Sequence, residues 1–189
     1  MQHAALALLS EAEYLSGETQ ARVRYEYLAG YVYAMAGASK AHNTIAGNLF
    51  AKLRAHLRGT PCRSFIADMK VRVATARSYY YPDVVTTCSE RDSAPDAPKD
   101  HLTEPALIVE VLSPATETID RREKLRAYTT LESLREYALI DSRRQQVELY
   151  RRLADGGWEQ WTWSEGEAMR LDSVGLEWAL ADLYEDVVF

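Results

Sequence analysis

The stretch Leu107-Ile108-Val109-Glu110-Val111-Leu112 decides the fold, because it is a strand-forming run interrupted by a single carboxylate. Alternation puts Ile108, Glu110 and Leu112 on one face and the other three residues on the opposite face. Both faces are apolar apart from Glu110, so we expect this strand at the centre of a sheet that is covered on both sides. A buried carboxylate is costly unless it is paired, protonated or bound to a cation.

A second carboxylate, Asp83, lies in the strand-like run Tyr81-Pro82-Asp83-Val84-Val85. Proline is tolerated in a strand where a ladder donor can be spared. Two carboxylates placed in strands suggest a shared cation. Glu110 could instead pair with an arginine in the core, or it could be exposed to solvent at a sheet edge.

The rest of the sequence predicts further strands and helices around these two runs. Ser10 and Glu13 form a capping-box pattern, and Ile45, Leu49 and Leu53 recur at every fourth position. Helices are expected over residues 10–20, from 39 to the Gly-Thr-Pro stop at 59–61, over 118–131 and over 178–184. Strands are expected over 23–28, 31–35, 62–67, 69–74, 81–85, 107–112, 136–140, 147–150 and 158–163. Residues 89–100 lack periodicity and predict a mobile loop that could cover a site.

The length of the chain favours one domain. With 189 residues, no internal repeat and no linker, residues 1–189 are expected to form a single unit. It divides into an N-terminal helix and hairpin (10–36), a core (37–150) and a C-terminal hairpin and helix (151–189). The expected fold class is α/β of the mixed α+β kind, with a central mixed β-sheet flanked by helices and a hairpin at each end.

Composition argues against several classes of protein. Hydrophobic residues make up 47% and charged residues 26% of the chain, and no stretch approaches the roughly 20 apolar residues of a membrane span. The apolar start, residues 1–9, has no basic flank, which argues against a signal peptide, so the cytoplasm is the expected location. A net charge of −6 gives no general attraction to nucleic acid. Binding would need a local basic surface, and the densest candidate is a helix face with Arg121, Arg122, Lys124 and Arg126, which could also be simply solvated.

The cysteines and the clustered aromatic residues give weaker signals. Cys62 and Cys88 lie outside a C-x-x-C spacing, so we expect buried free thiols rather than a zinc site or a disulfide. The run Tyr79-Tyr80-Tyr81 and the tryptophans at positions 158, 161 and 163 could stack on bases. Packing and cross-strand pairing are the favoured interpretation of both groups.

Lys124 adds a cation to the two carboxylates. At 100° per residue it shares a helix face with Asp120, Ala127 and Tyr128, which is the side that packs on the sheet. A helix pair between Asp120 and Lys124, with the lysine stem reaching out to solvent, would explain the pair but not the face. Carboxylates that hold Mg²⁺ or Mn²⁺, with a lysine that orients or deprotonates an attacking water, are suited to phosphodiester hydrolysis.

These residues belong to a larger set of motifs spread over most of residues 10–150. The set consists of Tyr25-Glu26-Tyr27-Leu28-Ala29-Gly30, Ala36-Gly37-Ala38-Ser39 with His42, Pro82-Asp83, Glu110-Val111-Leu112-Ser113-Pro114-Ala115-Thr116, Asp120, Lys124, Tyr128, and Glu136-Tyr137 ahead of Asp141. As an ensemble it resembles the Uma-two family of bacterial endonucleases, which belongs to the PD-(D/E)XK restriction-endonuclease-like superfamily.

The resemblance implies a fold and a set of metal ligands. It implies a restriction-endonuclease-like central mixed sheet flanked by helices, with Asp83, Glu110 and the backbone carbonyl of Val111 as ligands of Mg²⁺ or Mn²⁺. The superfamily usually carries its lysine two positions after the acidic residue, where this chain has Leu112. The catalytic role of the lysine would therefore pass to Lys124, which the helix face indicates independently.

Three residues are auxiliary candidates for the same site. The resemblance places Glu26 and His42 among the family's recurrent positions, where either could touch metal or phosphate, and Asp120 joins them through its helical spacing to Lys124. Two of them also have a purely structural alternative. Glu26 could pair with a neighbouring arginine along its hairpin, and His42 could cap its helix or hydrogen-bond inside it.

The leading hypothesis is a Mg²⁺- or Mn²⁺-dependent endonuclease that hydrolyses phosphodiester bonds of nucleic acid, with DNA as the expected substrate. A catalytically silent interaction module on the same fold is the first alternative, and a metal-dependent small-molecule phosphoesterase is the second. The hairpins and the apolar N-terminus make a homodimer plausible, and two-fold symmetry would suit double-strand cleavage.

Overall fold

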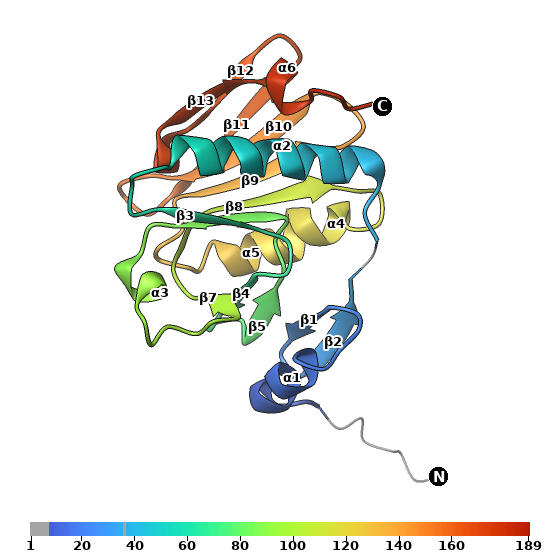
Figure 1. Cartoon of the computed structure of the whole chain (residues 1–189), viewed down its shortest axis with the longest axis vertical. Helices are drawn as coiled ribbons and strands as arrows, with labels where there is room; N and C mark the ends of the chain where they lie inside the picture. Colours follow the sequence, from blue (N-terminus) through green and yellow to red (C-terminus); the bar gives the residue numbers. More distant parts are fainter. Residues whose placement is uncertain (1–7, 36) are drawn as a thin grey trace.

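The computed structural model describes residues 8–35 and 37–189. It confirms the mixed α+β class: two mixed sheets and a C-terminal hairpin are flanked by helices (Figure 1). Most of the apolar start at residues 1–9, and position 36 of the motif at 36–39, lie outside the described residues. Within them, no helix is long and apolar enough to cross a membrane.

A six-stranded sheet forms the centre of the molecule. In spatial order its strands are β11 (Trp158–Ser164), β10 (Gln146–Arg152), β9 (Glu136–Asp141), β8 (Pro105–Leu112), β6 (Val84–Thr87) and β3 (Arg63–Ile66). Strands β8 and β9 run parallel, with Glu110 opposite Leu139, and the other pairs are antiparallel. β8 has a neighbour on each side, so the prediction of a central strand is confirmed and an edge position for Glu110 is excluded.

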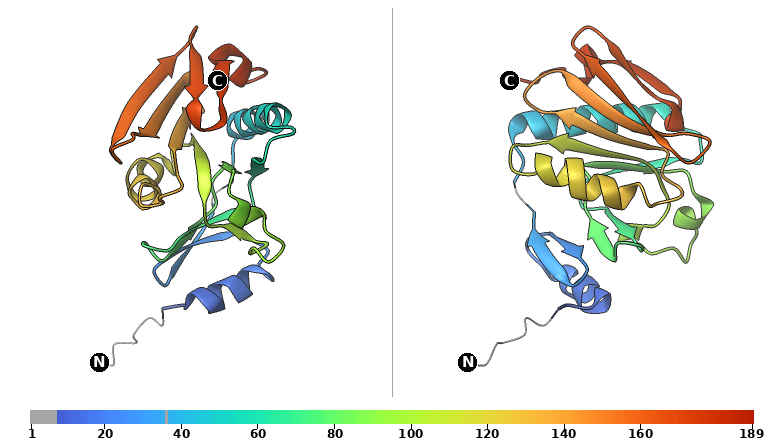
Figure 2. Two further views of the ribbon diagram at one scale, coloured as in Figure 1. Left: turned by 90° about the vertical axis from the view of Figure 1, so that its left-hand side faces the viewer. Right: turned by 180° about the vertical axis from the view of Figure 1, so that it is seen from behind.

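Helices cover both faces of this sheet, as the left view of Figure 2 shows. Helix α2 (Lys40–His56) covers one face, and its side chains Ile45, Leu49 and Leu53 pack in one core with alternate residues of β8 such as Val109. The helix begins at the N-cap Ser39, as predicted. The alternation in β8 therefore has the predicted effect, because one set of side chains meets α2.

The opposite face of β8 meets the helix predicted over residues 118–131. That helix consists of α4 (Glu117–Ile119), the π-helix η1 (Asp120–Lys124) and α5 (Leu125–Tyr128). Ala127 and Tyr128 pack with Ile108 and Leu112 of β8 in a second core. The widened π-turn was not predicted. It lies at Lys124, and such turns are frequent at functional sites.

A second, five-stranded sheet carries the N-terminal part of the chain. In spatial order its strands are β2 (Tyr31–Ala34), β1 (Tyr25–Leu28), β5 (Ser78–Tyr80), β4 (Lys70–Val73) and β7 (His101–Leu102). Helix α1 (Glu11–Glu18) has the predicted capping box and packs through Tyr14 on Tyr27 and Tyr79. The predicted tight turn joins β1 and β2 at Ala29 and Gly30, both with positive φ.

The C-terminal segment differs from its prediction. It contains β12 (Ala168–Leu171), the 3₁₀ helix η2 (Asp172–Val174), β13 (Leu176–Ala179) and α6 (Leu180–Leu183). The helix predicted over residues 178–184 is therefore too long, because Trp178 and Ala179 pair with β12. Pairing with a partner strand overrides the local helical pattern, and the short β12 was not predicted.

The cysteine prediction is wrong. Cys62 and Cys88 are half-buried and form a disulfide, and the described residues contain no free cysteine. The cause is strand pairing: Arg63 at the start of β3 lies opposite Thr87 at the end of β6. The two cysteines are the next residues beyond that pair, so the ladder brings their side chains together.

The loop at residues 89–100 contains a short helix, α3 (Glu90–Ser93), that was not predicted. The Asp92 carboxylate accepts hydrogen bonds from the backbone amides of Thr103 and Glu104 and from the Thr103 hydroxyl. The loop is therefore attached to the segment that enters β8, rather than to Asp83 or Glu110.

Candidate active site

The predicted site residues meet at one place in the fold. Glu26 comes from β1, Asp83 from the bend before β6, Glu110 from β8, and Asp120 and Lys124 from η1. We call these five residues, together with His42 of α2, the acidic cluster.

Glu110 is buried in the central sheet. Its Oε1 accepts hydrogen bonds from Lys124 Nζ at 3.1 Å and from the Tyr128 hydroxyl at 3.1 Å. Burial, with the nearby carboxylates of Asp120, Asp83 and Glu26, raises the pKa of Glu110 well above its ordinary value despite the attraction of Lys124. The partners of Glu110 are therefore a lysine and a tyrosine, in place of the arginine that the sequence left open.

Lys124 is the centre of the cluster. Its Nζ lies 3.0 Å from Glu26 Oε1, 3.1 Å from Glu110 Oε1 and 3.2 Å from Asp120 Oδ1. The residue is buried, so the idea of a stem that reaches out to solvent is wrong, although the pair with Asp120 exists. Desolvation alone would lower the pKa of Lys124, but the three carboxylates outweigh it and raise the pKa well above its ordinary value.

This charge state changes the expected chemistry of the lysine. A general base must lose its proton near the working pH, and a raised pKa opposes that loss. In this environment Lys124 is an ammonium group, which donates hydrogen bonds. Of the two predicted roles, a raised pKa favours orienting a water or phosphate oxygen over deprotonating a water.

Asp83 is positioned differently from its prediction. It precedes β6 instead of lying inside a strand, and 21% of its side chain is exposed. Its Oδ2 accepts a hydrogen bond from the Val111 amide at 2.7 Å and lies 3.1 Å from His42 Nε2. The ladder between β6 and β8 ends at the pair Val84–Val109. The Val111 amide therefore donates to the Asp83 side chain instead of to a backbone carbonyl of β6.

His42 joins the cluster through Asp83. Burial lowers the pKa of His42, but the hydrogen bond and charge of Asp83, the charge of Asp120 and a hydrogen bond to the Val111 backbone outweigh it, so the pKa is raised. The side chain of His42 is not the helix cap, because Ser39 caps the helix by accepting from the His42 backbone amide.

Glu26 also reaches the cluster rather than an arginine of its own hairpin. Its Oε1 accepts a hydrogen bond from the Tyr81 amide at 3.1 Å and contacts Lys124. Arg24 pairs with Asp68 instead. Glu26 therefore connects β1 with Tyr81, which precedes Asp83, and with Lys124 of η1. These three segments are distant from one another in the sequence.

Tyr128 also contacts the cluster, although the sequence analysis gave it no role beyond its place in the family motif. It is fully buried, and its hydroxyl donates to the same oxygen of Glu110 as Lys124 does. The signal was present, because Tyr128 follows Lys124 by four positions on the same helix face. Tyr80 was also missed: its ring centroid lies 5.8 Å from Lys124 Nζ. No local sequence pattern connects Tyr80 with Lys124.

The cluster fits a hard divalent cation in part. No group of three His, Cys, Asp or Glu side chains within residues 8–35 and 37–189 could hold a metal on its own. Mg²⁺ commonly uses only one or two carboxylates and completes its coordination with water and substrate phosphate. Asp83 Oδ1 and Glu110 Oε2 form no hydrogen bond within the described chain, and the Val111 backbone faces Asp83 where β6 has ended. Two carboxylates and one carbonyl of this kind suit Mg²⁺ or Mn²⁺.

The basic helix face is only partly free. Arg121 donates to both carboxylate oxygens of Glu148 on β10, at 2.6 and 2.8 Å, and to Glu117 at 2.9 Å. It therefore fastens the helix to the sheet. Arg122 and Arg126 are exposed and remain candidates for contact with phosphate.

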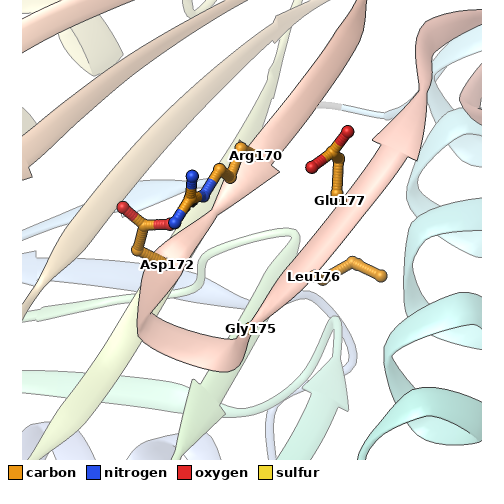
Figure 3. Close-up of a pocket in the computed structure, with 5 residues that line it drawn as sticks. All are labelled: Arg170, Asp172, Gly175, Leu176 and Glu177. Carbon is orange, nitrogen blue, oxygen red and sulfur yellow. Dashed lines mark hydrogen bonds and ion pairs between the residues drawn. The ribbon is translucent and has the colours of Figure 1, made fainter.

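A pocket of about 380 Å³ lies at the C-terminal hairpin of β12 and β13 (Figure 3). It is lined by Arg170, Asp172, Gly175, Leu176 and Glu177. The Asp172 amide donates to Glu136, the first residue of β9, whereas Glu110 lies beside Leu139 further along that strand. Arg170 and Asp172 neutralise each other. This pocket shares no residue with the acidic cluster.

Comparisons with known proteins agree with this architecture. Residues 11–182 match the family Uma2, described as "Putative restriction endonuclease". Two uncharacterized proteins of Synechocystis sp. are each 36% identical: slr1290 over 181 residues (96% of this chain, 94% of that protein) and sll1609 over 151 residues (80% and 85%). A crystal structure from Anabaena variabilis, described as a "putative nuclease belonging to DUF820", aligns with a TM-score of 0.78 at 18% identity. The alignment covers 94% of this chain and 98% of that one, so the two share a fold.

Proposed function

The chain belongs to the Uma2 family, and we propose that it is a Mg²⁺- or Mn²⁺-dependent endonuclease that hydrolyses phosphodiester bonds of nucleic acid, with DNA as the expected substrate. One observation carries the proposal: a buried lysine ammonium joins Glu26, Glu110 and Asp120 beside the partly exposed Asp83. Buried charges at this density are expensive for a fold and are typical of active sites.

Each residue has a defined part in the proposed reaction. Asp83, Glu110 and the Val111 carbonyl would hold the cation, which when bound neutralises phosphate charge and lowers the pKa of water. Lys124 would donate a hydrogen bond to the attacking water or to a phosphate oxygen in exchange for one of its three carboxylate contacts, and its positive charge would stabilise negative charge that develops in the transition state. Tyr128, Glu26 and Asp120 hold the ammonium and the Glu110 carboxylate in place.

The position of the lysine departs from the superfamily pattern. Leu112 occupies the usual lysine position and is buried in the core beneath the helix. It shares a face of β8 with Glu110, so a lysine there would also point toward η1. Lys124 reaches Glu110 from η1 instead, and so supplies an ammonium to the same carboxylate from a different element.

A cleavage assay tests the proposal. Supercoiled plasmid DNA is incubated with the protein in Mg²⁺ or Mn²⁺, and with the variants Lys124→Ala and Glu110→Gln. The matched controls are Lys99→Ala and Glu165→Gln, which make the same chemical changes at exposed positions. We expect metal-dependent cleavage by the parent and both controls and none by the two cluster variants. Cleavage by folded cluster variants at the parent rate would contradict the proposal.

Two alternative functions give different outcomes in these experiments. An interaction module is favoured by the charge balance of the cluster, since Lys124 already pairs with three carboxylates. It predicts no cleavage by the parent, with or without metal. A small-molecule phosphoesterase predicts hydrolysis with little dependence on salt, whereas nucleic-acid binding weakens steeply as salt rises. Light scattering on the same preparation tests the expected homodimer.

A further inference from the structure

Strand β2 exposes a row of large apolar side chains. Tyr31 is 52% exposed, Tyr33 54% and Met35 37%. Among the described residues neither tyrosine ring packs against another aromatic ring, and neither hydroxyl is hydrogen-bonded. The run Tyr79–Tyr81, for which packing was favoured over base stacking, is buried. Two exposed tyrosine rings therefore lie on β2, which is the outer strand of its sheet.

The register of the hairpin places this row beside the acidic cluster. Tyr33 lies directly opposite Glu26 and Tyr31 opposite Leu28, so these side chains share one face of the sheet. Glu26 extends from that face to Lys124. Past Met35 the chain continues to α2, which carries His42 (Figure 1). The row therefore runs alongside the proposed catalytic residues.

A groove lies beside β1, the strand that pairs with the row. Its volume is about 420 Å³, and Leu28, Tyr80 and Ala127 contribute to its walls, with Glu123 and Arg126 from the helix. Leu28 is the cross-strand partner of Tyr31, and the Tyr80 ring contacts Lys124. Arg126 is exposed and in no ion pair of the described chain, so it can meet a phosphate.

We propose that the row (Tyr31, Tyr33 and Met35) and this groove bind unpaired bases of the nucleic-acid strand that enters the active site. The inference rests on the proposed function and deepens it, because it makes single-stranded or flapped nucleic acid the preferred substrate class. Tyrosine rings stack on any base, since every base has a π-face, and Arg126 contributes a cation for the backbone. The row lies beside the acidic cluster, so a second copy of the chain bound there would cover the proposed active site. A nucleic-acid strand is therefore the favoured occupant.

The test measures binding of the metal-free protein to labelled oligothymidylate and to a duplex of the same length by fluorescence anisotropy. We expect tighter binding of the single strand. The double variant Tyr31→Ala/Tyr33→Ala should lose at least about tenfold in affinity with an unchanged salt slope, because the lost interaction is not ionic. Tyr31→Phe/Tyr33→Phe keeps the rings and should bind like the parent. Trp161→Ala, an exposed aromatic on β11, is the matched control.

The outcomes separate the inference from the function on which it rests. Unchanged binding by the alanine variant in a protein that cleaves nucleic acid overturns the inference and leaves the proposed function standing. Preference of the parent for duplex also overturns the inference. Conversion of a dimeric parent to a monomeric alanine variant, measured by light scattering, assigns the row to a contact between copies. A parent that neither binds nor cleaves nucleic acid overturns both.

Discussion

At the scale of single residues, Lys124 explains how several carboxylates can share the interior of one small protein. Its ammonium contacts three of them, and removing it leaves like charges in a medium that solvates them poorly. The buried charges are therefore interdependent, so the effect of one substitution depends on its partners.

Lys124→Ala is expected to lower the free energy of unfolding by about 3 kcal/mol at neutral pH, because it orphans buried carboxylates. The loss should shrink as the pH falls, since the orphaned carboxylates take up protons. Urea denaturation between pH 5 and pH 8 measures both effects, with Lys99→Ala as the control. A loss no larger than that of the control would show that the cluster is not held together by this charge.

Asp141, at the end of β9, gives a prediction about acid stability. Burial raises its pKa, but hydrogen bonds and charge from Arg143, with Arg144, outweigh it, so the pKa lies below its ordinary value of 3.8. A lowered folded-state pKa stabilises the protein above the unfolded pKa, and this contribution is lost as the pH falls through the folded value. Because the arginines are partly exposed, Asp141→Asn should cost only about 1 kcal/mol at pH 7.

The difference between the parent and Asp141→Asn should shrink as the pH falls below the ordinary value of 3.8, and it should vanish once the carboxyl is protonated in the folded state. Thermal unfolding followed by circular dichroism across this range makes the comparison. A difference that persists unchanged at the acid end would assign the effect to packing of the side chain rather than to its charge.

The residues of the site were predictable to different degrees. Glu110 and Lys124 follow from periods that any strand or helix imposes, so their burial could be inferred locally. The contacts of Glu26 and His42 could not, because they depend on how β1 and α2 are placed against the bend at Asp83. For those two residues the family resemblance identified the positions, and the structure supplied the partners.

At the scale of elements, the π-helix η1 brings Asp120 and Lys124 to the same side, toward Glu110. The Tyr137 hydroxyl of β9 donates to the Asp120 carbonyl at 3.1 Å, and Tyr137 is fully buried. A widened turn frees carbonyl groups from the regular helical ladder, and this tyrosine satisfies one of them.

Tyr137→Phe should therefore cost about 1 to 2 kcal/mol of stability, because it leaves a buried carbonyl without its donor. The urea midpoint measures the loss. Tyr150→Phe on the neighbouring strand is the control, since the Tyr150 hydroxyl has no hydrogen bond within the described chain. Equal midpoints for the two variants would mean that the Tyr137 hydroxyl does not support the π-turn.

The disulfide acts on the pairing of β3 with β6. It closes a sequence separation of 26 residues, and a loop of that length corresponds to about 3.5 kcal/mol of stabilisation in the chain-entropy model. Reductant should lower the free energy of unfolding by about this amount without loss of the fold. The double variant Cys62→Ser/Cys88→Ser should match the reduced parent and be insensitive to reductant. Identical urea curves with and without reductant would contradict the expected contribution.

At the scale of the whole molecule, the elements followed from local sequence more faithfully than their partners did. The central strand, the capped helices and the β1–β2 hairpin carry strong local patterns, and the structure contains each of them. The helix predicted at 178–184, the free thiols and the strand position of Asp83 failed for one reason. Each depends on the pairing of a segment with a partner strand, which the periodicity of that segment alone cannot show.

The most direct test of the metal site is a calorimetric titration of Mn²⁺ into the purified protein and into Glu110→Gln, because it needs no assumption about the substrate. We expect binding of about one ion per chain by the parent, loss of that binding in Glu110→Gln, and its retention in Lys124→Ala and in the control Glu165→Gln. Equal binding by Glu110→Gln and the parent, or no binding by a folded parent even with a phosphodiester oligonucleotide present, would contradict a metal site at the acidic cluster.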